Sequence, residues 1–230
     1  MPISRRTFVG TGVAAISSLG VAAKAVNAQV IYQHSDWKSA EFDSLIKHPA
    51  KGIKQAFDVR AIADGGFLNA MKNSLNGLHF GFDIPADQIK IVAALHGPAN
   101  MLNFDDSMWA KYRLGEWLKV NDPQTGKPAV RNPYFAKKPG VSTDPADRAS
   151  VFQDTSIEAL QGRGVKFLSC HNSTQAQARE LVEQYSLKQP SEEIVQDLQA
   201  HILPGVLIVP AMVATISLLQ SEGRFTYISG

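Results

Sequence analysis

The chain has 230 residues, of which 44% are apolar and 19% are charged, and its 23 basic side chains face 21 acidic ones. This composition excludes a disordered chain and a coiled coil, and a net charge of +2 is too small to indicate nucleic-acid binding. A single cysteine excludes an intramolecular disulfide, so the fold must depend on packing alone.

The first segment has the pattern of an export signal. Twin arginines, Arg5 and Arg6, are followed by a phenylalanine, a weakly apolar stretch, the basic Lys24 and a small-residue ending at Ala28. This pattern resembles a twin-arginine (Tat) signal, and the stretch falls short of the ~20 strongly apolar residues of a membrane span. Cleavage after Ala28 removes three basic residues and leaves 202 residues with a net charge of −1. We therefore expect a periplasmic protein.

The remainder, residues 29–230, is predicted to be one α/β domain. Short apolar runs of strand length alternate with segments of helical period, which is typical of a parallel sheet covered by helices. The expected strands are residues 53–59, 89–95, 165–169, 206–209 and, at an edge, 225–228. The expected helices are residues 66–80, 107–118, 150–162, 174–185, 191–201 and 212–222. Whether residues 30–32 form a further strand is left open.

An insertion at about 103–148 interrupts this pattern. Its five prolines after the expected helix predict a long surface connection rather than a core element. Asp105 and Asp106 are candidates to cap the helix that follows them. Aromatic residues, including Trp109 and Tyr112, are concentrated here. They either pack on the domain, or form a lid or a subunit contact near the strand ends.

Reactive residues follow two of the predicted interior strands. His96 comes directly after residues 89–95, and Cys170 and His171 come directly after residues 165–169. Since the carboxyl ends of parallel strands form the ligand-binding edge of an open sheet, we expect these three candidate catalytic residues to share one rim. His171 would point away from Cys170 in an extended backbone, so His96 is the better candidate partner for the thiol.

Three interpretations of Cys170 are open. Backbone N–H groups and the helix dipole can favour a thiolate just before a helix, with an imidazole as base. Alternatively, Cys170 is a small buried apolar residue, as free cysteine often is. One Cys and two His also match a ligand set for zinc or copper, although the spacings HxxxH, CxxC and HExxH are absent. Nucleotide-binding and haem-attachment motifs are absent too, so no cofactor is expected.

Four motifs together resemble the DsrE/DsrF-like family, also called YchN-like. They lie between residues 53 and 228, outside the insertion. The motifs are Asn69-Ala70-Met71-Lys72-Asn73-Ser74-Leu75-Asn76, Ile91-Val92-Ala93-Ala94-Leu95-His96-Gly97-Pro98, Gly164-Val165-Lys166-Phe167-Leu168-Ser169-Cys170-His171-Asn172, and Leu203-Pro204-Gly205-Val206 continuing through Val209-Pro210-Ala211 to Leu219-Gln220-Ser221-Glu222-Gly223 and Tyr227-Ile228.

The resemblance implies a three-layer α/β/α domain around a mainly parallel five-stranded sheet, assembled as a trimer or hexamer. In some family members a cysteine carries persulfide sulfur, and Cys170 falls at a position similar to the cysteine of the YchN-like members. The insertion and the export signal depart from the compact cytoplasmic members.

We therefore predict a periplasmic DsrE-like protein that binds or relays sulfur through Cys170, with His96 or His171 tuning the thiolate and the insertion covering the site. The expected partners are further copies of the chain and a sulfur donor or acceptor, either a protein or a small sulfur species. Neither nucleic acid nor, after signal cleavage, a membrane is expected. The alternatives are a non-catalytic oligomeric binding module, with Cys170 packed and the insertion making subunit contacts, and a metal-binding periplasmic protein.

Overall fold

The computed structural model of the protein describes residues 32–47, 52–140 and 153–230. Within them, five strands form one sheet in the order β4-β3-β2-β1-β5, and every neighbouring pair is parallel. The strands are β1 (Ile53–Val59), β2 (Ile89–Leu95), β3 (Lys166–Cys170), β4 (Leu207–Val209) and β5 (Thr226–Ser229). The predicted five-stranded α/β fold is confirmed, and β5 lies at the expected edge.

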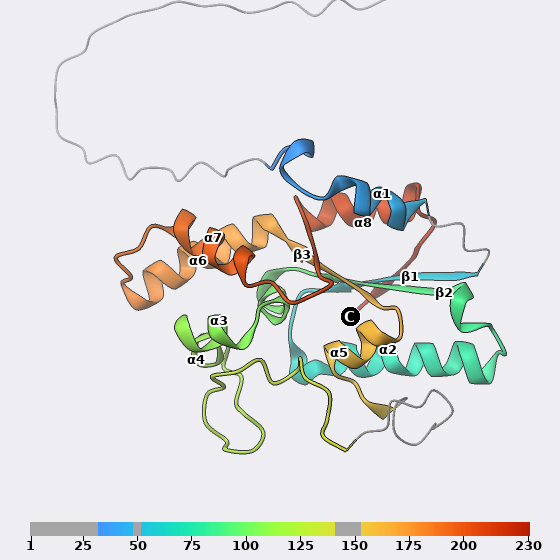
Figure 1. The fold of residues 1–230 in the computed structure, drawn as a ribbon, viewed down its shortest axis with the longest axis horizontal. Coiled ribbons are helices and arrows are strands. Elements are labelled where there is room, and N and C mark those ends of the chain that lie inside the picture. Colours follow the sequence, from blue (N-terminus) through green and yellow to red (C-terminus); the bar gives the residue numbers. More distant parts are fainter. Residues whose placement is uncertain (1–31, 48–51, 141–152) are drawn as a thin grey trace, which may run out of the picture.

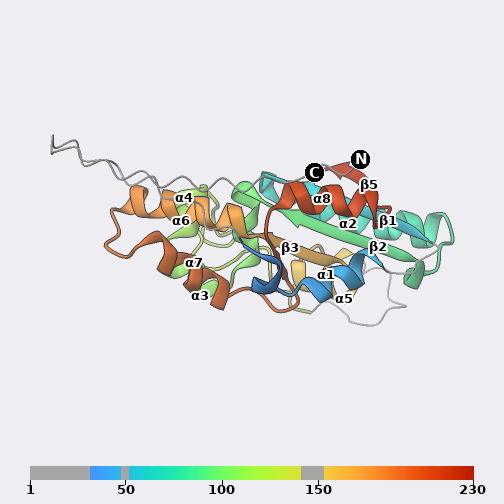
Figure 2. The same ribbon diagram turned by 90° about the horizontal axis from the view of Figure 1, so that it is seen from above.

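Helices cover both faces of the sheet, which gives three layers (Figures 1 and 2). Helices α1 and α8 lie on one face and α2 and α5 on the other, while α3, α4, α6 and α7 extend past one end of the sheet. The α-helices are α1 (Ser39–Ile46), α2 (Gly66–Asn76), α3 (Asp106–Lys111), α4 (Leu114–Leu118), α5 (Ile157–Gly162), α6 (His171–Tyr185), α7 (Ser191–Ala200) and α8 (Met212–Ser221). Shorter helical turns are η1 (His34–Asp36), η2 (Ala63–Gly65), η3 (Gly77–Gly81), η4 (Ala86–Gln88) and η5 (Gly97–Asn103).

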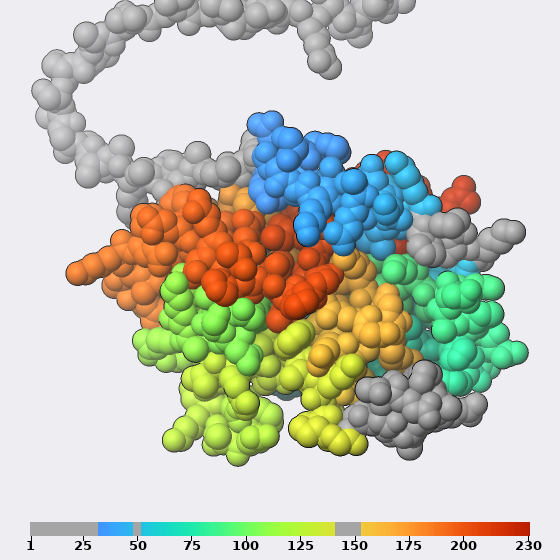
Figure 3. Space-filling model, viewed as in Figure 1, coloured from blue at the N-terminus to red at the C-terminus, as the bar shows by residue number. Residues whose placement is uncertain are grey.

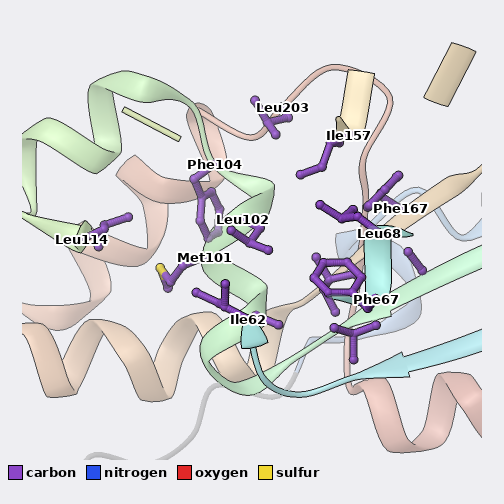
Figure 4. Packing of buried hydrophobic residues seen from close by; sticks show 14 of the residues in the cluster. Ile62, Phe67, Leu68, Met101, Leu102, Phe104, Leu114, Ile157, Phe167 and Leu203 are labelled. Atoms are coloured by element: carbon purple, nitrogen blue, oxygen red, sulfur yellow. The ribbon is translucent and has the colours of Figure 1, made fainter. Parts of the chain in front are cut away.

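Alternate residues of the strands enter two separate hydrophobic clusters, because successive side chains of a strand point to opposite faces. Phe57 and Phe167 pack into the larger cluster with α2, α5 and η5, whose close packing is visible in Figure 4. Ala94, Leu168 and Cys170 belong to the smaller cluster beneath α1 and α8. The sulfur of Cys170 therefore faces the α1 and α8 side of the sheet.

The proline-rich insertion is not the surface connection that its prolines predicted. Trp109 is fully buried, Ala129 is nearly so, and both belong to the larger core cluster. The chain packs so closely that a Cβ on Gly115 would lie 2.2 Å from the Ala129 carbonyl oxygen. Residues 104–132 therefore contribute core side chains to the domain. The part of the insertion at 141–148 lies outside the described residues.

Most element boundaries agree with the predictions to within a few residues. Two expected helices differ. The helix expected at 107–118 is broken into α3 and α4 at Arg113, which adopts a left-handed conformation with φ 51°. The helix expected at 150–162 begins only at Ile157, after its N-cap Ser156. Asp105 caps α3 as predicted, accepting from the backbone N–H groups of Ser107 and Met108.

The export signal at 1–28 and residues 30–31 lie outside the described residues. Among the residues described, no helix combines the length and the apolar character that crossing a membrane requires.

Candidate functional site

The carboxyl ends of β1, β2 and β3 meet at one edge of the sheet and bring chemically active side chains together. The last paired residues of β2 and β3 are Leu95 and Ser169, and His96 and Cys170 each follow directly. The backbone of His96 is still extended, with φ −148° and ψ −179°. His96 therefore continues the register opposite Cys170, on the same face of the sheet. The predicted rim thus joins Cys170 to His96.

The Cys170 sulfur lies between the first turns of two helices. It accepts the backbone N–H of Ser173 in α6 and that of Met212 in α8, each with an N···S distance of 3.4 Å. First-turn N–H groups have no partner within their own helix and carry the positive end of the helix dipole. Two such groups from separate helices therefore present partial positive charge to one sulfur. Cys170 itself is 4% exposed.

Buried Asn100 in η5 fixes the backbone around Cys170. Its Oδ1 accepts the Cys170 backbone N–H and the Ser169 hydroxyl, both at 2.9 Å. Its Nδ2 donates to Thr174 Oγ1 at 3.0 Å and to Gln177 Oε1 at 3.2 Å. One amide side chain thus links the end of β3 to the first two turns of α6, which determines where the sulfur lies.

His96 has a carboxylate partner from the next strand. Its Nε2 lies 2.6 Å from Asp58 Oδ1, and both side chains are 15% exposed. Tyr227 of β5 donates its hydroxyl to the other oxygen of Asp58 at 2.8 Å. The acid therefore orients the imidazole, as the carboxylate does in a catalytic triad. Cys170, His96, Asp58 and Tyr227 follow one another across β3, β2, β1 and β5.

His171 lies apart from this row, at the start of α6. Its ring stacks on Tyr32, with 4.1 Å between centroids. Its Nδ1 lies 2.7 Å from Gln199 Nε2, and its Nε2 lies 2.9 Å from Gln175 Nε2. Both ring nitrogens therefore have partners other than the thiol, and burial lowers the pKa of the imidazole. Strand register therefore places His96, and not His171, next to Cys170 on the same face of the sheet, and the Nε2 atom of His96 faces Asp58.

We expect His171 to make the protein less stable in mild acid. Because its pKa is lowered in the folded chain, the unfolded chain binds the proton more readily below about pH 6.5. The stability that neutral His171 provides is therefore present above about pH 6.5, and it is lost as the pH falls toward the pKa of His171 in the folded chain. Urea unfolding at pH 7.5 and pH 5 should show a smaller loss of stability for His171→Gln than for the wild type. The exposed His34→Gln control should match the wild type; equal losses in all three proteins would contradict this role.

Sequence reasoning did not identify Asp58, Asn100 or Tyr227 as site residues. Asp58 offered a signal, since an acid in the second half of an apolar strand needs a partner. Asn100 and Tyr227 offered no such signal.

No three His, Cys, Asp or Glu side chains are grouped closely enough to hold a metal ion anywhere in residues 32–47, 52–140 and 153–230.

No protein-family model, no curated protein and no solved structure matches this chain. Its function is therefore inferred from the side-chain geometry and from the sequence patterns.

Proposed function

We propose that this protein is a periplasmic, DsrE-like sulfur carrier that holds a sulfur atom as a persulfide on Cys170. The observation that carries the proposal is the pair of backbone N–H groups, from Ser173 and Met212, that the Cys170 sulfur accepts. Groups of this kind stabilise negative charge on sulfur, and the thiolate is the reactive form of cysteine. The twin-arginine pattern of residues 1–28 supports export, and the family resemblance supports a trimer or hexamer.

The proposed reaction needs only a donor with a sulfur–sulfur bond. His96, oriented by Asp58, accepts the thiol proton, and the Cys170 thiolate attacks the outer sulfur of thiosulfate or the terminal sulfur of polysulfide. The donor S–S bond breaks as the new S–S bond to Cys170 forms, and sulfite or a shorter polysulfide leaves with the electron pair. The persulfide anion keeps the negative charge near the two N–H groups. An acceptor thiolate takes the outer sulfur by the same exchange in reverse.

We expect incubation of the native protein with polysulfide to add one sulfur atom to Cys170, as detected by intact-mass and peptide mass spectrometry. Cys170→Ser should gain none. Replacement of the oriented base, His96→Gln, should slow loading by about 10²-fold or more, because a general base contributes about that much. His171→Gln should load at the wild-type rate, since its ring nitrogens face other partners.

A denatured sample provides the control for chemical competence of the thiol. If the unfolded chain gains sulfur while the native chain does not, the carrier function is wrong. Equal slowing by the two histidine variants would reject the role of His96 while leaving persulfide formation intact.

Burial of the thiol favours a second candidate function, an oligomeric binding module without sulfur chemistry. At 4% exposure, Cys170 also fits a packed residue whose sulfur simply caps α6. Labelling of the native thiol separates the two functions. A carrier should react with a small reagent such as iodoacetamide much faster than with a bulky maleimide, whereas a packed cysteine should react with neither until the protein unfolds.

A further inference from the structure

A pocket of about 320 Å³ lies between α6, α7 and the N-terminal residues from Tyr32 to Asp36. In Figure 3 these N-terminal residues, in blue, lie against the orange surface of the later helices. A second cavity of about 440 Å³ shares Tyr32, Asp36 and Gln199 with the first. The volume of the first pocket is at the lower end of the range for small-molecule sites. It therefore suits a metabolite of a few heavy atoms rather than a cofactor.

Neutral hydrogen-bonding groups form the floor of this pocket. His171, 4% exposed, lies there with the amides of Gln175 and Gln199 on its two ring nitrogens. Burial lowers the pKa of the imidazole, so the floor carries no charge at neutral pH. Tyr32 and Val195 supply an apolar wall. A ligand's charge must therefore be matched by other side chains.

Charges of opposite sign line the same pocket. Arg179 of α6 is half-buried, and no hydrogen bond or ion pair joins it to another residue in the described ranges. Glu192, in the first turn of α7, is exposed. Asp36 already accepts the Gln33 backbone N–H and the Ser35 hydroxyl. Arg179 and Glu192 are therefore the charged side chains of the lining that have no hydrogen bond or ion pair with another described residue.

We propose that this pocket binds a small zwitterion of the α-amino acid class. The ligand's carboxylate pairs with Arg179, its ammonium group pairs with Glu192, and its side chain lies against Tyr32 and Val195. One cation and one anion on opposite helices match the two charges of an amino acid better than they match a simple acid or a simple amine. The site is separate from the proposed sulfur chemistry, since Cys170, His96 and Asp58 are not among the residues that line the pocket.

Isothermal titration of the full chain with each of the twenty L-amino acids tests the proposal. We expect at least one to bind, and to bind at least tenfold more tightly than its decarboxylated amine or its deaminated acid. Arg179→Gln should weaken binding at least tenfold, as loss of a charge-assisted contact predicts. Arg179→Lys should recover part of the affinity, and the exposed Arg60→Gln should leave it unchanged. The ring resonances of His171 should shift during the titration.

Three results would overturn the proposal: no amino acid binds at millimolar concentration, the amine or the acid alone binds equally well, or Arg179→Gln binds like the wild type. Thermal unfolding of each variant verifies that it is folded. Cys170→Ser should keep full binding, so failure of this site and failure of the sulfur-carrier function are distinguishable.

Discussion

Asn100→Ala should lower the free energy of unfolding by about 3 kcal/mol and should expose Cys170 to thiol reagents. The side chain is fully buried and makes four hydrogen bonds between the end of β3 and the start of α6. Truncation leaves the Cys170 N–H and the Ser169 hydroxyl without their acceptor, and each buried group without a partner costs about 1–3 kcal/mol. Urea unfolding measures the loss, and iodoacetamide labelling measures the exposure.

Two further variants keep this expectation testable if Asn100→Ala fails to fold. Ser169→Ala removes one donor to Asn100 Oδ1 and should cost about 1 kcal/mol. Asn73→Ala, at an exposed position of α2, should change stability by less than about 0.5 kcal/mol. An Asn100→Ala protein as stable as Asn73→Ala, with Cys170 still protected, would show that the network does not hold the site.

The strands were predictable because their residues carry the signal locally. β1 and β2 begin and end where their apolar runs do, at 53–59 and 89–95. Only Lys90 interrupts the apolar residues of β2, as expected for a strand buried on both faces, whereas β1 also contains Lys54, Gln55 and Asp58. The helix break at Arg113 was not predictable, because arginine is not among the residues that favour a left-handed backbone.

The burial of the insertion was not predicted, because proline indicates where regular secondary structure ends and carries no information about burial. The prolines do break the helices and strands between residues 119 and 140. Burial there depends on contacts with distant elements, such as Asn132 Nδ2, which donates to the carbonyl oxygens of Leu102 and Phe104. No local pattern encodes these contacts.

The position of the candidate site was predictable from the sequence, but the hydrogen bonds within it were not. Strand ends of a parallel sheet share one edge, so His96 and Cys170 could be placed together from their positions after two strands. Strand alternation also fixes the face of Cys170, since Leu168 has the same parity. The contacts of Cys170 with Asn100 and Met212 join segments 70 and 42 residues away, and only the folded chain reveals them.

Trp109→Ala should destabilise the folded chain by about 3–5 kcal/mol without changing its state of association. Trp109 is fully buried within its own chain, and its indole N–H donates to the Met101 carbonyl oxygen at 3.3 Å. Removing the ring leaves a cavity in the larger core cluster, although the Met101 carbonyl still accepts the backbone N–H of Phe104. The interpretation of this aromatic residue as a subunit contact requires an exposed ring, which a single chain does not present.

Unfolding in urea and sedimentation of the folded protein separate these interpretations. Trp109→Phe should recover much of the stability, because it fills most of the cavity. Trp117→Ala, at a half-buried ring in α4, should cost less than Trp109→Ala. The sedimentation coefficient of folded Trp109→Ala should equal that of the wild type. A variant that keeps its unfolding midpoint but sediments as a smaller particle would instead place Trp109 between subunits, because loss of an interface contact affects assembly before it affects the core.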